Sequence, residues 1–248
     1  MIKTKPVRTG YPIINADDLG MSAEINQAVA IAFHNDWITT ASLMTNMPGF
    51  EDACSLIESE RLQARVGVHL NLSEGVPITH RIRACERFCD ESGMFRNRAA
   101  ARESAFFLSE FERQAVRQEL EAQIRALSSL GIHPCHLDSH RHHHTEWAIG
   151  QVVIELARQA DITAIRIMRN CKPLGGPVKR VYRAIFNRNL RRAALARSRY
   201  FGSAAEIKPI LKSCDQVEIM VHPRLVRGEV FDLEKNLLSS VIADLQAG

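Results

Sequence analysis

The chain has 248 residues, of which 46% are hydrophobic and 24% charged, a composition that suits a globular protein with a full apolar core. No apolar run reaches the roughly 18 residues that cross a bilayer, and the basic N-terminus lacks the apolar stretch of a secretory signal. The six cysteines form no CxxC pair, so we expect reduced thiols in a cytoplasmic protein rather than a disulfide framework.

The formal net charge of +4 comes from one segment. Residues 162–205 hold 11 Lys or Arg and no Asp or Glu, so the rest of the chain has 21 basic and 28 acidic residues. Without this segment the protein would be acidic.

Short apolar runs alternate with helical patterns along the chain. In chain order, the expected strands are residues 11–15, 38–44, 64–72, 134–138, 163–168 and 216–221. The first expected helices begin at Ser22 and cover about 49–59. The next runs from a capping box at Ser109 and Glu112 to Gly131. The last three cover 147–160, begin near Ser203 with a glutamate again three residues on, and cover 232–246. This alternation predicts βαβ crossovers and a parallel sheet.

Side chains that bind metals or protons lie at, or directly after, the ends of five of the expected strands. They are Asp17 and Asp18, Asn46, His69 and Asn71, Asp138 and His140, and His222. Because the carboxyl ends of parallel strands open onto the same face, these side chains should meet at one mouth. The pattern favours a single barrel-like domain, with an open sheet as the alternative.

The first of these sites is the pair Asp17 and Asp18 in INADDLG, directly after a buried run. On a turn, one carboxylate can bind a metal while its neighbour serves as a base. The competing interpretation is a loop with a helix N-cap, where Asp is common.

His69 and His222 each stand in an apolar run, where a histidine is costly unless it has a partner. A satisfied core histidine is the alternative for each.

The stretch HPCHLDSHRHHH, residues 133–144, is the densest signal. In an extended chain Asp138 and His140 share one face, His142 and His144 continue it, and His136 also lies on it. Alternate imidazoles and a carboxylate suit Zn²⁺, Fe, Mn²⁺ or Co²⁺, and Mg²⁺ if water fills the shell. The alternative is a solvated histidine-rich loop.

Four segments together, IINADDLGMS, GVHLNLSEG, HLDSHRHHH and EIMVHP, resemble the YdjC-like carbohydrate deacetylases, the ChbG/HpnK family. They occur in the family's order from about residue 11 to 223. Leu19 stands where the family usually has Phe, a packing position. The resemblance implies an irregular (β/α) barrel, a single domain related to polysaccharide deacetylases.

The resemblance also implies one divalent ion, Mg or Zn, with Asp18, His69 and His140 as its ligands. Asp17 matches the family's proposed general base, and His222 matches its proposed general acid. Arg166 matches an arginine that would hold a carboxylate. Further residues expected to support the ligands or contact substrate are Asn71, Asp138, His142 and His144.

This ligand set fits the hydrolysis of an N-acetyl group on an amino sugar. The reaction needs an activated water, a stabilised oxyanion and a protonated leaving amine. A metal phosphoesterase or amidohydrolase, favoured by a second metal, is one alternative, and a non-catalytic carbohydrate-binding protein is another.

Two segments lie outside these motifs. The insert at residues 73–108 is expected to form a sugar-binding wall or a lid above the site. The basic segment at 166–200 predicts an amphipathic helix, either packed on the barrel or contacting a phosphate-bearing or lipid-linked substrate or the inner face of an anionic membrane. No recognition module for nucleic acid is visible. A homodimer is an expectation from the family alone.

Overall fold

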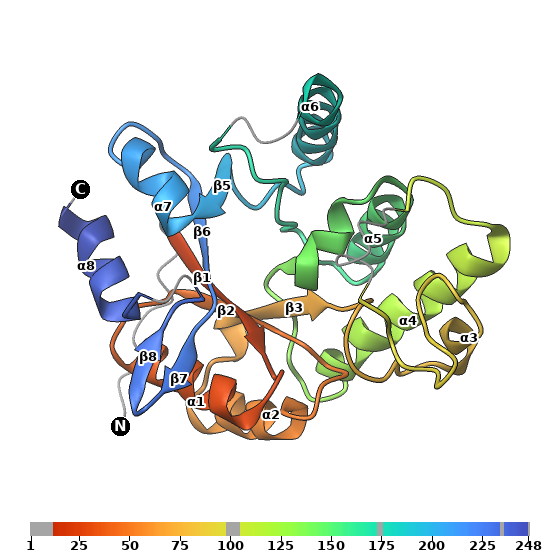
Figure 1. The fold of residues 1–248 in the computed structure, drawn as a ribbon, viewed down its shortest axis with the longest axis horizontal. Coiled ribbons are helices and arrows are strands. Elements are labelled where there is room, and N and C mark those ends of the chain that lie inside the picture. Colours follow the sequence, from red (N-terminus) through yellow and green to blue (C-terminus); the bar gives the residue numbers. More distant parts are fainter. Residues whose placement is uncertain (1–11, 98–104, 173–175, 234–235, 248) are drawn as a thin grey trace.

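The structure is a computed structural model that describes residues 12–97, 105–172, 176–233 and 236–247. Its centre is a curled, six-stranded parallel sheet with helices around the outside (Figure 1). The strands are β1 (Ile13–Leu19), β2 (Thr40–Leu43), β3 (Val66–Leu70), β4 (Leu137–Ser139), β5 (Tyr200–Ser203) and β6 (Val217–Val221). This sheet confirms the expected α/β class with an irregular, barrel-like curl.

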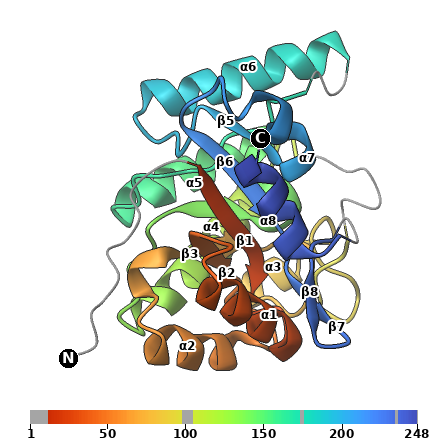
Figure 2. The ribbon, with the colours of Figure 1, turned by 90° about the vertical axis from the view of Figure 1, so that its left-hand side faces the viewer.

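The helices follow the strands in the expected alternation. They are α1 (Ala23–His34), α2 (Phe50–Ser59), α3 (His80–Arg83), α4 (Glu110–Ser128), α5 (Trp147–Gln159), α6 (Pro177–Arg192), α7 (Ala204–Ile207) and α8 (Leu238–Ala247), with 3-10 turns η1 (Gln63–Arg65), η2 (His140–Thr145) and η3 (Lys208–Ile210). Helices α1 and α2 pack together, as do α4 and α5. Figure 2 shows α6 at the end of the molecule opposite α2.

The strand order is β4-β3-β2-β1-β6-β5, and the expected fifth strand at 163–168 is not formed. Ile165 alone bridges Leu137 on one side and Ala196 on the other, both in parallel. Beyond it, the amide of Asn187 bonds the backbone N–H and C=O of Met168, at 2.8 and 3.0 Å. A side chain therefore replaces the sheet hydrogen bonds, and the barrel is irregular at this point.

Other boundaries also differ from those expected. The first strand continues to Leu19, and the closing helix begins at Leu238 rather than at residue 232. The helix after Ser203 has only four residues before η3, which contains Pro209, because proline has no backbone N–H to continue the α-helical hydrogen bonds. A short hairpin, β7 (Arg224–Val226) with β8 (Glu229–Phe231), was not expected. Both expected capping boxes, at Ser109 and Ser203, are present.

The basic segment contains α6, which is amphipathic. Phe186 and Leu190 are buried, whereas Val178, Val181 and Ile185 are exposed at 83%, 59% and 44%.

The six cysteines are free, as expected. Among the described residues, none of the helices combines the length and the apolarity that a membrane span requires.

Candidate metal centre

A β-bulge near the end of β1 places two adjacent carboxylates in one site. Three residue steps on β1, from Ala16 to Leu19, face two steps on β2, and Asp18 takes a φ of 66°. Neighbours in a regular strand point to opposite faces, whereas a bulge re-aims one of them. The expected turn after the strand is therefore wrong, because Asp17 and Asp18 lie within the strand. Aspartate tolerates this left-handed conformation better than most residues.

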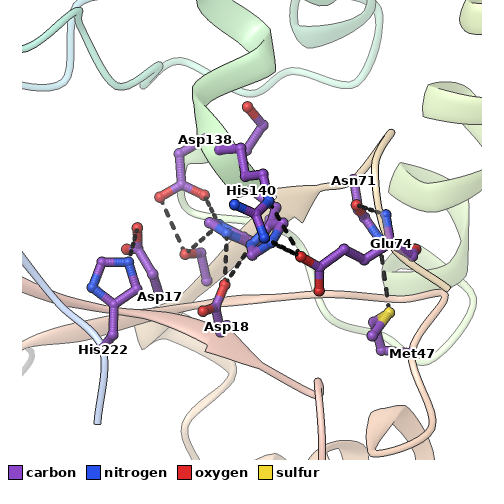
Figure 3. A network of polar contacts seen from close by, with 12 residues as sticks. Asp17, Asp18, Met47, Asn71, Glu74, Asp138, His140 and His222 are labelled. Atoms are coloured by element: carbon purple, nitrogen blue, oxygen red, sulfur yellow. Dashed lines mark hydrogen bonds and ion pairs between the residues drawn. The ribbon is translucent and has the colours of Figure 1, made fainter. Parts of the chain in front are cut away.

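Two histidines from different strand ends converge on one oxygen atom of Asp18. Oδ1 of Asp18 lies 2.8 Å from Nδ1 of His140 and 3.2 Å from Nε2 of His69 (Figure 3). Ligand atoms of these three residues all lie within 4.8 Å of one another. Burial disfavours the ionised form of Asp18, but both histidines hold its pKa well below the usual value. A buried carboxylate between two imidazoles is a donor set that a divalent cation fits.

His69 is fixed on its other side by the expected residue Asp138. The Nδ1 atom of His69 lies 2.7 Å from Oδ1 of Asp138, and the hydroxyl of Ser42 donates to Oδ2 of the same carboxylate at 3.1 Å. Burial lowers the pKa of His69, yet Asp138, Asp18 and Asp17 together outweigh it and raise that pKa to about 10. A carboxylate on the outer nitrogen is the arrangement that orients histidine ligands in metalloproteins.

Arg166 lies at the centre of the barrel and is completely buried. Its guanidinium donates two hydrogen bonds to Asp17, at 2.7 and 2.8 Å, and contacts Asp138 at 2.8 Å and Glu218 at 2.8 Å. Burial opposes ionisation of Asp17, but Arg166 lowers its pKa overall. Asp17, His69 and Asp138 are also close enough to form a second metal group. Arg166 already supplies the positive charge beside both carboxylates of that group.

His222 approaches Asp17 from the end of β6. Its Nε2 atom lies 3.9 Å from Oδ2 of Asp17, and its side chain is 24% exposed. The backbone N–H of His222 donates to Asp232 at 2.7 Å, which fixes the chain at this point. Figure 3 shows the imidazole facing Asp17, on the side of the site away from His140.

The chain after Ser139 is not extended, so the expectation that His142 and His144 continue one face of the strand is wrong. The chain turns into η2, where Arg141 and His142 have φ values of 52° and 58°. His144 instead bonds the hydroxyl of Ser139 at 2.7 Å and the carbonyl of Arg166 at 3.1 Å. His142 packs against the ring of Phe201, with centroids 5.7 Å apart. His140, the first residue of η2, is the one that reaches Asp18.

Asn71 is buried within the loop that follows β3. Its amide oxygen accepts from the backbone of Ser73 and Glu74, and its amide nitrogen donates to the carbonyl of Glu74 at 2.7 Å. These bonds use the side chain within the loop, so Asn71 shapes the segment that carries Glu74.

Glu74 itself was not among the expected site residues. Its Oε1 atom lies 3.1 Å from Nε2 of His140 and also accepts from the guanidinium of Arg141. The hydrogen bond with His140 is the main cause that lowers the pKa of Glu74 to about 2. The signal was its place in GVHLNLSEG, three residues after Asn71.

Two charged residues inside the barrel were also missed. Glu218 is fully buried in β6 and pairs with Arg166 and, at 2.8 Å, with Arg197. Arg197 also donates to Asn15 at 3.2 Å. A glutamate in the middle of the apolar run QVEIMV indicated an internal partner, because a buried charge is costly without one.

A cavity of about 840 Å³ adjoins this centre. Its lining includes Arg141 and His142 from η2, Phe201 from β5, and Lys179 and Tyr182 from α6. The cavity thus opens between η2 and α6, beside the cluster of Asp18 rather than on it.

Similar proteins share both sequence and fold with this chain. A carbohydrate deacetylase of Halalkalibacterium halodurans is 36% identical over 160 residues, 64% of each chain. A carbohydrate deacetylase of Geobacillus stearothermophilus is 34% identical over 163 residues, 66% of this chain and 62% of the relative. The match thus spans less than two thirds of either relative's length. A crystal structure from Enterococcus faecalis V583, named for cellobiose-phosphate cleavage, is 24% identical with a TM-score of 0.67, over 86% of this chain and 81% of that one.

The comparison that covers most of the chain is with a family. The sequence profile described as "YdjC-like protein" matches residues 12–240, which include Asp18, His69 and His140 and both β1 and β6. The chain therefore belongs to the YdjC-like protein family.

Proposed function

We propose that this protein is a metal-dependent hydrolase that removes the N-acetyl group from an acetylated amino sugar. The observation that carries the proposal is the convergence of Asp18, His69 and His140 on one point, beside Asp17 and His222. The two relatives named carbohydrate deacetylases support the same reaction and substrate class.

Asp18, His69 and His140 would hold one divalent ion. Two imidazoles and a carboxylate suit Zn²⁺, and Mg²⁺ fits if water completes its shell. When bound, such an ion supplies Lewis acidity and lets water act as a nucleophile near neutral pH.

Asp17 and His222 would move the protons. Arg166 keeps Asp17 ionised and fixes both of its oxygens, so Asp17 can accept a proton from the attacking water. His222 lies next to Asp17, on the side of the site away from His140, and is partly exposed, so it can donate a proton to the leaving amine. The 3.9 Å between these two side chains is longer than a hydrogen bond, as is common before substrate binds.

The arrangement of charges disfavours a two-metal phosphoesterase. Such enzymes clamp the substrate between two ions about 3.5–4 Å apart. Here the guanidinium of Arg166 contacts both Asp17 and Asp138, the carboxylates that a second ion would need. A second cation would have to displace a buried arginine.

One substitution distinguishes a carbohydrate-binding protein from an enzyme. Asp17 is paired with Arg166 and is not one of the three clustered ligands, so Asp17→Asn should leave metal binding in place. A carbohydrate-binding protein would then keep its affinity for the glycan, whereas a deacetylase would lose turnover.

We also propose that α6 contacts an anionic part of the substrate or an anionic membrane surface in the cytoplasm. The helix carries Lys179 and Arg183 at the cavity and has no acidic residue. Its exposed Val181 and Ile185 are flanked by cations, the pattern of a helix that lies on an anionic lipid surface. Flotation with anionic and with neutral liposomes, at low and high salt, tests the membrane version. Absence of binding to both kinds of liposome would refute it.

Sedimentation of the protein in solution tests the family-level expectation of a homodimer.

The proposed reaction is tested by acetate release across a panel of N-acetylated glycans. The enzyme is first treated with a chelator and then supplied with Zn²⁺, Mg²⁺ or Mn²⁺. Acetate release that disappears with chelation and returns with one of these ions is expected. Turnover that is insensitive to chelation would contradict the metal requirement.

A further inference from the structure

Each imidazole of the cluster lies between two carboxylates. His69 presents Nε2 to Asp18 at 3.2 Å and Nδ1 to Asp138 at 2.7 Å. His140 presents Nδ1 to Asp18 at 2.8 Å and Nε2 to Glu74 at 3.1 Å. The rings meet edge to face, with centroids 5.7 Å apart. The two histidines thus use opposite nitrogens toward the same carboxylate oxygen.

From this geometry we propose that Glu74 is a positioning residue of the metal centre, which holds the proton on Nε2 of His140 so that Nδ1 is the ligand atom. The inference rests on the proposed function, because it assumes that the cluster of Asp18 binds a divalent ion. In this arrangement the ion would bind Nε2 of His69 and Nδ1 of His140.

Hydrogen-bond chemistry supports the assignment. Nε2 of His69 and Nδ1 of His140 both point to the oxygen of Asp18, where an ion would take the place of their protons. A neutral imidazole then keeps its one proton on the outer nitrogen, and the carboxylate of Asp138 or Glu74 accepts it. Arg141 donates to the same Oε1 atom that faces His140, which holds that oxygen in place. Glu74 would therefore do for His140 what Asp138 does for His69.

The two outer carboxylates differ in how firmly they are held. Asp138 is fully buried in β4, where Ser42 and Arg166 fix its second oxygen. The side chain of Glu74 is 28% exposed, on the loop after β3 that Asn71 braces. Removing the carboxylate of Glu74 should therefore alter the metal centre with little effect on the core, which makes it the better position for a test.

A direct role for Glu74 as a fourth ligand makes different predictions. As a positioning residue, Glu74→Gln keeps an oxygen that can accept from Nε2 of His140, so part of the metal affinity should survive. Glu74→Ala removes the acceptor, and Nε2 of His140 becomes free to bind the ion. If Glu74 were a ligand, both variants would lose a similar part of the protein's Zn²⁺ affinity, because an amide oxygen is a weak donor for Zn²⁺.

The experiment measures Zn²⁺ affinity by competition with a chromophoric chelator, together with the ligating nitrogens by NMR of ¹⁵N-histidine protein loaded with ¹¹³Cd²⁺. Glu74→Ala should bind Zn²⁺ about 10- to 100-fold more weakly, and Glu74→Gln should lie between it and wild type. The control is Glu121→Ala, which removes a partly exposed carboxylate that pairs with Arg125 on α4, and it should leave the affinity unchanged. Wild-type protein should show ¹¹³Cd coupling to Nδ1 of His140.

The outcomes separate this inference from the proposed function. Wild-type coupling to Nε2 of His140, an equal loss of affinity in both Glu74 variants, or unchanged affinity in Glu74→Ala would overturn the role of Glu74 and leave the deacetylase proposal standing. Wild-type protein that binds no divalent ion would overturn both.

Discussion

The guanidinium of Arg166 holds both carboxylate oxygens of Asp17, at 2.7 and 2.8 Å, although 149 residues separate them in the chain. The same guanidinium contacts Asp138 and Glu218. One buried cation therefore joins β1, β4 and β6 beside the group of Asp18, His69 and His140. Because Arg166 pairs with Asp17 and Asp138, Asp18 is the aspartate of the site that remains available for an ion. Asp18 lies between two histidines.

Replacing Arg166 should destabilise the protein strongly. In Arg166→Met three buried carboxylates lose their shared counter-charge, and breaking a buried pair in this way costs about 3–5 kcal/mol of unfolding free energy. Urea denaturation measures the loss. The control is Arg113→Met, which removes an exposed pair with Glu155 and should cost at most about 1 kcal/mol. Similar losses in the two variants would contradict a central role for Arg166.

The same pairing predicts how stability depends on pH. The pKa of Asp17 and that of Asp138 are lowered in the folded protein, by Arg166 acting against the cost of burial. A carboxyl with a lowered folded pKa stabilises the protein above its unfolded pKa, near 3.8, and loses that contribution as the pH falls further. Wild-type stability, followed by urea midpoints between pH 6 and pH 2.5, should therefore drop below about pH 4. A flat profile across that range would argue against these ion pairs.

The two adjacent aspartates should have separable roles. Asp18→Asn removes the carboxylate that both histidines face, so Zn²⁺ binding should be lost in calorimetric titration. Asp17→Asn leaves those three ligands in place and should keep Zn²⁺ binding, while acetate release falls by about 10²- to 10⁴-fold, the usual contribution of a general base. Equal metal affinity in both variants would show that Asp17 and Asp18 do not have separate roles in metal binding.

The glycine after this pair should tolerate no side chain. Gly20 has a φ of 86°, and a Cβ there would lie 2.6 Å from the backbone oxygen of Met44. Gly131 has a similar φ of 71° but open space around it. Gly131→Ala should therefore cost only the left-handed strain of about 1–2 kcal/mol. Gly20→Ala should cost more, and it should also weaken Zn²⁺ binding because β1 must shift near Asp18. Equal thermal stability of the two variants would contradict this.

The sequence was sufficient to predict the residues that meet at the strand ends. Asp18, His69 and His140 were expected to lie together because parallel strands bring their carboxyl ends to one face, and the structure places their ligand atoms within 4.8 Å. The capping boxes at Ser109 and Ser203 were also readable, because they depend on residues only three apart.

The features that the sequence did not reveal depend on contacts between distant segments. The bulge at Asp18 is a mismatch between two strands, which neither strand shows alone. The loss of the fifth strand depends on Asn187 from α6 bonding the backbone of Met168. Glu74 gave a local signal in its motif, but its partner His140 lies on another strand end, and no periodicity links the two.

The most direct test of the account is anomalous X-ray scattering at the zinc edge from crystals grown with excess Zn²⁺. The account predicts one strong peak between the carboxylate of Asp18, Nε2 of His69 and Nδ1 of His140, with Arg166 still paired to Asp17. A peak elsewhere with none at this point, or these three side chains turned away from one another, would contradict it.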